Sequence, residues 1–336
     1  MKHQNYFNNF LTNTVDLSKF RLETLERQAN AVYSALNADS DLGPRVIKKI
    51  PQGSWAHETI INPINGREVD ADFLLQLKEE PDWEFDPQQY NNAVYRALHN
   101  HPVYGDMPHG RKCRCVYVNY ANATHVDVVP YIVLSDGRKV IVNRNDNQFE
   151  NTDPEGFTAW MKERDQVANR NLRKVIRLMK YLRDHKGSFN GVKSILLTTL
   201  LGQQVEAYKK VLDVGYYADV PTTLLHVVSD LDAYLQANYV KPSVADPSGS
   251  GVTFDRRWSQ ETYSNFRTRI HGIACQIKAA YDEEDQDESV ELWQGLFGEK
   301  FQPPEATSAS SSKFGASAAA AGGAVPTSTG RSGRAG

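Results

Sequence analysis

Hydrophobic and polar positions follow different patterns in the two halves of the chain. Before about residue 150, short runs of Val, Ile, Leu and Tyr are separated by polar turns, which is typical of β-strands. Beyond about residue 157, apolar residues recur every three or four positions, which is typical of amphipathic helices. The pattern predicts an α+β fold with a sheet-containing lobe over residues 1–150 and a helical lobe over residues 151–302.

The same pattern predicts the individual elements. Strands are expected through Asp70 and Asp72 and at Val46–Gln52, Val116–Tyr120, Thr124–Val133 and Val140–Asn143. Helices are expected near Trp55 and at Asp16–Ala38, Pro87–Asn100, Thr158–His185, Asp219–Ala237, Ser259–Tyr281 and Ser289–Phe297. We expect Asp16–Ala38 to pack along both lobes as a spine, and the acidic stretch Asp282–Glu291 to form a solvated linker.

Two carboxylates, Asp70 and Asp72, lie one residue apart on a predicted strand. Successive side chains of a strand point to opposite faces, so both carboxylates share one face. Like charges on a half-buried strand repel each other, and a divalent cation would compensate them. Asp127, on another predicted strand, supplies a third carboxylate. Three carboxylates from two strands suit two Mg²⁺ ions that promote phosphoryl or nucleotidyl transfer.

The segment before these carboxylates has features suited to phosphate binding. Gly53 permits close approach of a ligand to the backbone, and the Ser54 hydroxyl with adjacent N–H groups can hold phosphate oxygens. The N-terminal amides of a helix beginning near Trp55 would favour an anion at the same place. A nucleoside triphosphate is such an anion.

Together, Gly53-Ser54, Asp70-x-Asp72 and the distant Asp127 resemble the signature of the DNA-polymerase-β-like nucleotidyltransferases. Within that superfamily, residues 1–303 most resemble the bacterial cGAS/DncV-like nucleotidyltransferases, which make cyclic oligonucleotide signals in anti-phage defence. Three further stretches support the narrower resemblance: LMKYLRDHK at Leu178–Lys186, DRRW at Asp255–Trp258, and LWQGLFGEKF at Leu292–Phe301. The last stretch leans toward clade D and toward relatives that make adenine-containing cyclic trinucleotides.

The resemblance implies a polymerase-β-like lobe, an OAS-like helical lobe and an active site between them. It implies two Mg²⁺ ions, for which Mn²⁺ could substitute, and the triphosphate of ATP or another nucleotide. The residues that it implies for metal binding and catalysis are Asp70, Asp72 and Asp127, and those for the triphosphate are Gly53, Ser54, Lys180 and Ser194. A ribose hydroxyl of one nucleotide would attack the α-phosphorus of another, pyrophosphate would leave, and ring closure would give a cyclic di- or trinucleotide.

The resemblance also implies partners. Some relatives lie beside HORMA-type activators, and some are conjugated through a C-terminal residue by ubiquitin-like machinery, for which Gly336 is suited here. A downstream effector would bind the product. The Ala/Ser/Gly-rich stretch 303–336 is expected to be a disordered tail, because it cannot bury enough apolar surface to fold.

Composition sets bounds on location and partners. The formal net charge is −3, so the total charge does not require a nucleic-acid partner. No apolar run reaches the length of a membrane span, and the first residues lack the apolar core of a signal peptide. We therefore expect a cytoplasmic protein without membrane contact.

Basic residues occupy many polar positions of the predicted helix Thr158–His185. Apart from Lys180, we expect them to form a solvated face. Farther along, the segment Phe254–Trp258 borders the expected nucleotide pocket by resemblance, where an aromatic ring or an Arg plane could stack on a base. The alternative is that Trp258 is the first core residue of the next helix.

Two other assignments stay open. Cys113 and Cys115, with His101 and His109 nearby, are either a zinc site or reduced structural thiols. His125 either contacts a ligand or is a structural, hydrogen-bonded histidine.

Two other functions also stay open. One is a nucleotidyltransferase that uses an RNA or small-molecule acceptor. The other is an inactive lobe that serves as a binding scaffold. Three intact carboxylates argue against the scaffold, because their mutual repulsion would gain it nothing.

Overall fold

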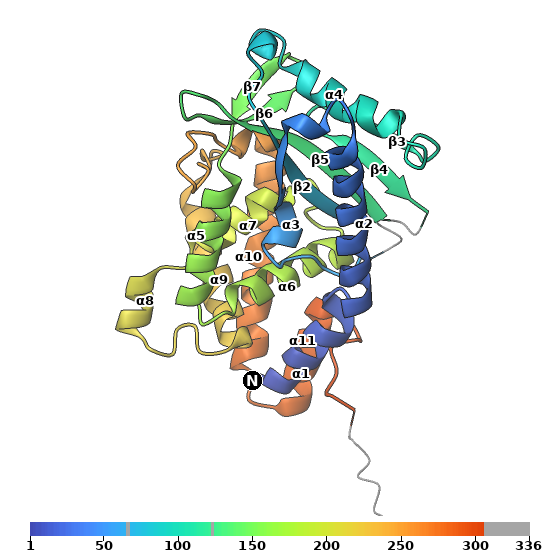
Figure 1. The fold of residues 1–336 in the computed structure, drawn as a ribbon. Coiled ribbons are helices and arrows are strands. Elements are labelled where there is room, and N and C mark those ends of the chain that lie inside the picture. Colours follow the sequence, from blue (N-terminus) through green and yellow to red (C-terminus); the bar gives the residue numbers. More distant parts are fainter. Residues whose placement is uncertain (65–67, 122–123, 306–336) are drawn as a thin grey trace, which may run out of the picture. The chain divides into compact units, whose positions relative to one another are not determined.

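The computed structural model describes residues 1–64, 68–121 and 124–305. In the first half of the chain, short runs rich in β-branched residues form a seven-stranded sheet (Figure 1). The predicted turn residues 122 and 123 and most of the expected tail, residues 306–336, lie outside the described residues. The strands are β1 (Val46–Pro51), β2 (Val69–Leu77), β3 (His109–Arg111), β4 (Val116–Tyr120), β5 (Thr124–Val133), β6 (Lys139–Asn143) and β7 (Gln148–Asn151).

The sheet is mixed, which confirms the α+β prediction. Its main order is β1-β2-β5-β4-β3, with β6 joined to β5 and β7 joined to β6. β2 and β5 pair in parallel, and the other neighbouring pairs are antiparallel. The long central pair β2 and β5 therefore brings side chains from two strands into one continuous register. The short strands β3 and β7 are absent from the prediction, because each has only three or four residues with little apolar alternation.

Two helices cover one face of the sheet: α2 (Lys19–Ala38) and α4 (Gln88–His99) (Figure 1). The Ser18 hydroxyl caps α2 by accepting a hydrogen bond from the backbone N–H of Arg21. The buried stripe of α2 consists of Leu25, Ala29, Val32 and Leu36, and it packs into the same core as the sheet and α4. Along the chain, the segment between α2 and α4 also contains α3 (Gly53–Ala56) and the 3₁₀ turns Gly43–Arg45 and Pro81–Trp83.

The predicted spine is wrong in its detail. The chain begins with α1 (Gln4–Phe10) and a π-helical stretch, Leu11–Val15, and these pack in the core of the helical lobe. Phe7 and Phe10 contact the aromatic rings of α11 and the residues after it, including Phe297 and Phe301. Contacts with the two lobes, which we expected from one helix, are therefore divided between α1 and α2.

The helical lobe is built from the apolar stripes of the second half of the chain. Its helices are α5 (Pro154–Val167), α6 (Leu172–Lys186), α7 (Ser194–Gln203), α8 (Ala207–Leu212), α9 (Val220–Ala237), α10 (Gln260–Asp282) and α11 (Gln286–Phe297), with a 3₁₀ turn at Asp255–Arg257. Asp219 and Ser259 cap α9 and α10, close to where the sequence predicted these helices to begin. Asp285 caps α11, so the predicted acidic linker is shorter than expected.

The single helix predicted over Thr158–His185 is instead two helices, α5 and α6. The chain turns between them at Asn169 and Arg170, whose φ angles are 51° and 62°. Asp165 supports the turn, because its backbone carbonyl accepts from the N–H of Arg170 and its carboxylate accepts from the N–H of Arg173. No Gly or Pro marks this break, which is why the sequence pattern misses it.

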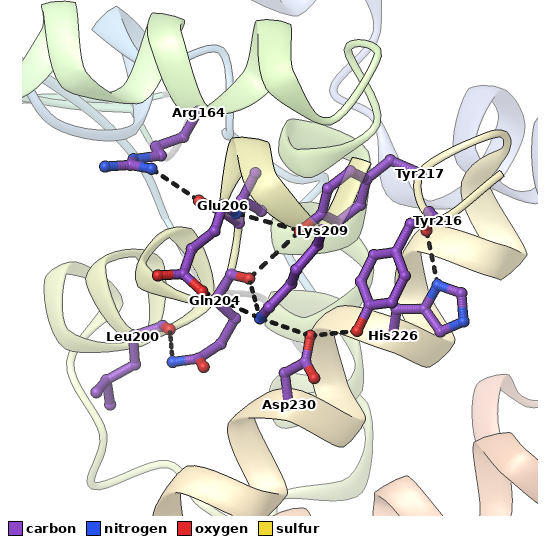
Figure 2. A network of polar contacts seen from close by, with 10 residues as sticks. Arg164, Leu200, Gln204, Glu206, Lys209, Tyr216, Tyr217, His226 and Asp230 are labelled. Carbon is purple, nitrogen blue, oxygen red and sulfur yellow. Dashed lines mark hydrogen bonds and ion pairs between the residues drawn. The ribbon is translucent and has the colours of Figure 1, made fainter. Parts of the chain in front are cut away.

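A polar network holds α8 and the loop after it (Figure 2). Lys209 donates to Asp230 over 3.1 Å and to the carbonyl oxygen of Gln204 over 3.0 Å. The Tyr216 hydroxyl donates to the same Asp230 carboxylate over 2.8 Å, and the Tyr217 hydroxyl accepts from the backbone N–H of Glu206. These bonds tie the short α8 to α9. We call this group of residues the Lys209–Asp230 network.

None of the described helices is long and apolar enough to cross a membrane.

Candidate functional site

The candidate carboxylates meet on neighbouring parallel strands. In the β2–β5 register, Asp72 lies opposite Asp127 and Asp70 lies opposite His125. Val69, Ala71 and Phe73 are buried on the other face of β2, as the alternation predicted. The fold therefore places Asp70, Asp72 and Asp127 on one face of the sheet, over the segment where the two central strands run side by side.

Burial and two neighbouring carboxylates disfavour the charged form of Asp72. Burial, together with the nearby charges of Asp127 and Asp70, raises the pKa of Asp72 from 3.8 to about 7. Lys112 and His125 oppose this shift only in part. The site thus holds more negative charge than the surrounding side chains neutralise, and it would favour a cation.

Lys112 and His125 surround Asp127. The Lys112 ammonium lies 3.1 and 3.0 Å from the two Asp127 oxygens and 2.7 Å from His125 Nε2, and His125 Nε2 lies 2.7 Å from Asp127 Oδ1. Burial alone would raise the pKa of Asp127, but the hydrogen bonds from His125 and Lys112 outweigh it and hold this pKa below its ordinary value. Asp127 is therefore ionised, and His125 is a hydrogen-bonded histidine that orients it.

Gly53 lies directly against Asp72. It adopts a φ of 65°, and a Cβ atom at this position would come within 2.6 Å of Asp72 Oδ2. The backbone N–H of Gln52 donates to the Asp72 carbonyl oxygen over 3.0 Å, which fixes the approach. Only glycine meets both requirements. The helix expected near Trp55 begins at Gly53 and is a single turn, so it contributes little helix dipole.

A cavity of about 190 Å³ brings four of the predicted residues together. Its lining includes Ser54, Asp70, Lys180 and Ser194. These residues come from α3, β2, α6 and α7, so the cavity lies between the two lobes. The fold thereby brings Ser54 and Ser194, which lie far apart in the sequence, to one small site.

Lys180 is a buried cation in this cavity. It is 4% exposed, and its ammonium donates to the carbonyl oxygen of Thr59 over 2.9 Å and to the Thr59 hydroxyl over 3.0 Å. Burial, helped by the positive charge of Arg183, lowers the pKa of Lys180 to about 7. An anion in the cavity would favour the charged form of Lys180 and raise its pKa again, so the ammonium is suited to contact phosphate oxygens.

A second cavity of about 400 Å³ adjoins the other side of the carboxylates and is lined by Gly53 and Asp72. Three arginines reach it: Arg114, Arg256 and Arg257. Arg114 forms a two-pronged ion pair with Glu150, at 2.5 and 2.7 Å. Burial, together with the charges of the other two arginines, lowers the pKa of Arg257.

The segment predicted to border this pocket does so in part. Phe254 lines the larger cavity, as do the two arginines after it. Trp258 is 6% exposed and packs against Tyr263 and Phe266, which confirms the alternative that it is a core residue. An Arg plane or the Phe254 ring, rather than Trp258, is therefore available to a nucleotide base.

The carboxylates fit a metal site that a ligand completes. Within the part of the chain that the structure describes, no three His, Cys, Asp or Glu side chains gather closely enough to hold a metal ion by themselves. The Cys113 thiol donates to Asn143 Oδ1 over 3.0 Å and Cys115 packs with Val129 and Tyr131, which favours the alternative that both are reduced structural thiols. Magnesium in such sites takes one or two carboxylates and fills its other positions with water and substrate phosphate, so Asp72 and Asp127 suffice when a triphosphate is bound.

Sequence reasoning missed three charged residues of the site. Lys112 follows a loop without a distinctive pattern, and only the β3–β4 connection brings it to Asp127. Arg183, which we expected on a solvated face, donates to the Ser194 hydroxyl over 3.2 Å and lines the smaller cavity. Arg114 lies between the two cysteines that suggested zinc. Each depends on tertiary packing rather than on a local pattern.

The chain resembles known nucleotide-signal synthases over most of its length. Residues 1–165 match the family model of the Second Messenger Oligonucleotide or Dinucleotide Synthetase domain, which contains Gly53, Ser54 and all three carboxylates. The chain is a cGAS/DncV-like nucleotidyltransferase. The c-di-GMP synthase of Roseivirga ehrenbergii is 23% identical over 326 residues, which cover 86% of this chain and 82% of that protein. The cyclic AMP-AMP-AMP synthase of an Acinetobacter species is 22% identical, covering 81% of this chain and 78% of that one.

Solved structures agree on the fold. CdnC of Escherichia coli MS115-1, solved with ATP, has a TM-score of 0.66 at 20% identity and covers 89% of this chain and 98% of its own. Vibrio cholerae DncV without ligand has a TM-score of 0.68 at 18% identity, with coverages of 89% and 96%. The polymerase-β-like lobe and helical lobe expected from the sequence are confirmed.

Proposed function

We propose that this nucleotidyltransferase makes an adenine-containing cyclic di- or trinucleotide from nucleoside triphosphates, as a signal in cytoplasmic anti-phage defence. The observation that carries the proposal is the joining of Ser54, Asp70, Lys180 and Ser194 in one cavity beside the Asp72–Asp127 pair. The names of the two sequence relatives, a c-di-GMP synthase and a cyclic AMP-AMP-AMP synthase, support the product class and leave the bases open.

Asp70, Asp72 and Asp127 would hold two Mg²⁺ ions, or Mn²⁺ in their place. Bound there, the ions would supply charge neutralisation and would lower the pKa of a coordinated hydroxyl. The raised pKa of Asp72 supports this assignment, because the carboxylates need positive charge that the neighbouring side chains supply only in part. Lys112 would have to leave the Asp127 oxygens that it contacts in the described structure.

The chain positions the donor nucleotide from the opposite side. Lys180 and Ser194 would contact the β- and γ-phosphates, and Ser54 with the Gly53 backbone would hold the remaining phosphate oxygens. The larger cavity, with Phe254 and Arg256 on its wall, has room for the second nucleotide. The site would thus hold two nucleotides on the two sides of the carboxylates.

Transfer follows from this placement. The ribose hydroxyl of one nucleotide attacks the α-phosphorus of the other, a new phosphodiester bond forms, and the bond to pyrophosphate breaks. The hydroxyl proton passes to the ionised Asp127 carboxylate, which His125 keeps in position. In a last transfer, after two or three nucleotides are joined, the free ribose hydroxyl of the linear product attacks the α-phosphorus of its own triphosphate, which closes the ring and releases pyrophosphate.

The test is a product analysis with purified protein. The protein is incubated with four radiolabelled ribonucleoside triphosphates and Mg²⁺ or Mn²⁺, and the products are treated with phosphatase and resolved. We expect a phosphatase-resistant product that is absent from an Asp70→Ala/Asp72→Ala variant, and omission of single nucleotides names its bases. If the label instead appears on an added RNA end or small molecule and no cyclic product forms, the protein is a nucleotidyltransferase with a different acceptor, and the proposal is wrong.

A protein activator and a conjugation step are further parts of the proposal. CdnC of Escherichia coli MS115-1 has been solved in complex with a HORMA protein, which supports a HORMA-type activator here. Activity that appears only when such a protein is added would support it. The suggested conjugation site, Gly336, lies outside the described residues, and deletion of residues 331–336 should abolish any cellular conjugate. The downstream effector is sought with the labelled product.

A further inference from the structure

A basic cavity lies on the helical lobe, apart from both cavities of the candidate site. Its volume is about 380 Å³, and its lining comes from Glu58, α5, α6 and the turn between these helices. Five of the eight lining residues are basic: Lys162, Arg170, Arg173, Lys174 and Arg177. The sequence pattern assigned these side chains to a solvated face, but the structure gathers them around one hollow.

The basic residues outnumber their carboxylate partners. Arg173 pairs with Glu58 over 2.9 Å and approaches Asp165 to 3.6 Å, and Arg177 lies 3.2 Å from Asp16. Lys162 and Arg170 have no side-chain hydrogen bond or ion pair with any described residue. Lys174 donates to Asn171 Oδ1 over 3.4 Å and interacts with the Asp16 charge, but it forms no ion pair with a described carboxylate within 4 Å. Three cations are therefore left for an anion from outside the chain.

Backbone conformation adds a second observation. Asn169 and Arg170 occupy the left-handed region, with φ angles of 51° and 62°, and Glu58 across the cavity has a φ of 54°. Arg and Glu rarely adopt this conformation, because it brings their Cβ atom close to the following carbonyl oxygen. Backbone in the left-handed region therefore borders the cavity at both Arg170 and Glu58.

We propose that this cavity binds a compact polyphosphate, either free or carried by a nucleoside. Arg and Lys in a small volume recognise clustered phosphate oxygens through charge-assisted hydrogen bonds. The volume suits a nucleotide-sized ligand. A nucleic-acid backbone carries its charge over a longer distance and would match a row of spaced cations better than this single hollow.

The cavity is linked to the candidate site through two adjacent residues. Glu58 forms an ion pair with Arg173, and the next residue, Thr59, accepts both hydrogen bonds from Lys180. An anion that draws Arg173 away from Glu58 would release the segment that holds Lys180. This part of the inference rests on the proposed function, because it makes the cavity a regulator of the triphosphate pocket.

Hydrogen exchange locates the binding directly. Tripolyphosphate is titrated into the full-length protein without divalent cations, and amide exchange is followed by mass spectrometry. We expect protection of peptides from residues 162–177 and altered exchange of residues 57–60. In an Arg170→Gln/Lys174→Gln variant, the half-saturating concentration should rise at least about tenfold, because two charge-assisted contacts are lost.

The matched control is Lys19→Gln/Arg269→Gln, which makes the same charge change at two exposed positions elsewhere and should bind as the wild type does. Equal binding by the cavity variant, or no protection of residues 162–177, would overturn the proposal. Protection confined to these residues would retain the site and overturn the link to Lys180.

Two further ligands identify the source of the anion. If ATP saturates the protection of residues 162–177 at a lower concentration than tripolyphosphate does, the site binds nucleotides. If tripolyphosphate saturates it at the lower concentration, the site binds free polyphosphate. A 20-nucleotide RNA that protects the same peptides at lower phosphate concentration than either would replace the proposal with a nucleic-acid surface. None of these readouts uses catalytic turnover, so failure of the proposed synthesis would not be mistaken for failure of this site.

Discussion

The candidate site and the Lys209–Asp230 network both gather charged and hydroxyl groups between helices or strands, but they balance charge differently. In the network, burial alone would lower the pKa of Lys209, and the bond to Asp230 outweighs it and raises this pKa (Figure 2). Asp230 accepts from Tyr216 as well. In the candidate site, burial and two neighbouring carboxylates raise the pKa of Asp72 to about 7.

The difference separates a structural network from a site for a ligand. A buried charge that is paired with an opposite charge of the same chain needs no ligand, and its role is structural. A buried charge without enough compensation destabilises the folded chain, and it is retained where a ligand supplies the missing charge. The carboxylates lack positive charge and the basic cavity lacks negative charge. The Lys209–Asp230 network lacks neither.

The largest effect that distinguishes the two regions is expected for Asp127→Asn. The substitution removes the ionised carboxylate and keeps its shape, so turnover should fall by at least about 10³-fold while ATP binding survives. Initial rates and equilibrium binding of ATP measure the two effects. The control is Asp230→Asn in the network, which should keep at least about half of the turnover because it lies away from the candidate site. An active Asp127→Asn enzyme would contradict the assignment.

The next effect is expected for Gly53→Ala. Its new Cβ would meet Asp72 Oδ2 at 2.6 Å, and displacement of a catalytic carboxylate should lower turnover by about 10²-fold. Gly137→Ala is a matched control, because Gly137 has a φ of 87° and no atom within 4 Å of a new Cβ. Both variants should lose about 1–2 kcal/mol of unfolding free energy through left-handed strain. Equal turnover in the two variants would remove the proposed role of Gly53.

A smaller effect, on stability alone, is expected for Asp230→Ala. Lys209 and Tyr216 would each lose a half-buried acceptor, so the free energy of unfolding should fall by about 1–3 kcal/mol. Chemical denaturation measures this loss, and turnover of the folded fraction should be unchanged. A stable variant would show that the Lys209–Asp230 network does not support α8.

The remaining effect is a pH dependence of stability from Asp72. Its pKa is about 7 in the folded chain against an ordinary 3.8, so the unfolded chain releases this proton more readily. The folded state therefore loses stability as the pH rises from about 4 to about 7, and the loss is complete above that window. Without divalent cations, Asp72→Asn should unfold at a higher temperature than the wild type at pH 8 and at a nearly equal temperature at pH 4. An equal difference at both pH values would contradict the shift.

Local patterns were enough to predict the central strands and the shared face of Asp70 and Asp72. Alternation along a strand decides which side chains share a face, and it does not depend on distant residues. The predicted positions of Lys180 and Ser194 came from a family resemblance, and the structure brings both to the cavity that Ser54 and Asp70 line.

Tertiary packing decided what the sequence could not. Lys112 and Asp127 are 15 residues apart, and their contact depends on how β4 pairs with β5. The turn at Arg170 lacks Gly or Pro, so the pattern ran on as a single helix. The basic residues of that stretch form a cavity only because α5 and α6 diverge there. A sequence pattern shows which charges exist, whereas packing decides whether each one finds a partner.

The central claim is that uncompensated buried charge marks the ligand site, and a comparison of thermal unfolding tests it most directly. Mg²⁺ and a nonreactive ATP analogue are added to the wild type, to Asp72→Asn/Asp127→Asn and to the network variant Asp230→Ala. We predict that the ligands raise the Tm of the wild type and of Asp230→Ala by similar amounts, because both keep the carboxylates that the ligands neutralise. The double variant should show no rise. An equal rise in all three proteins, or none in the wild type, would contradict the account.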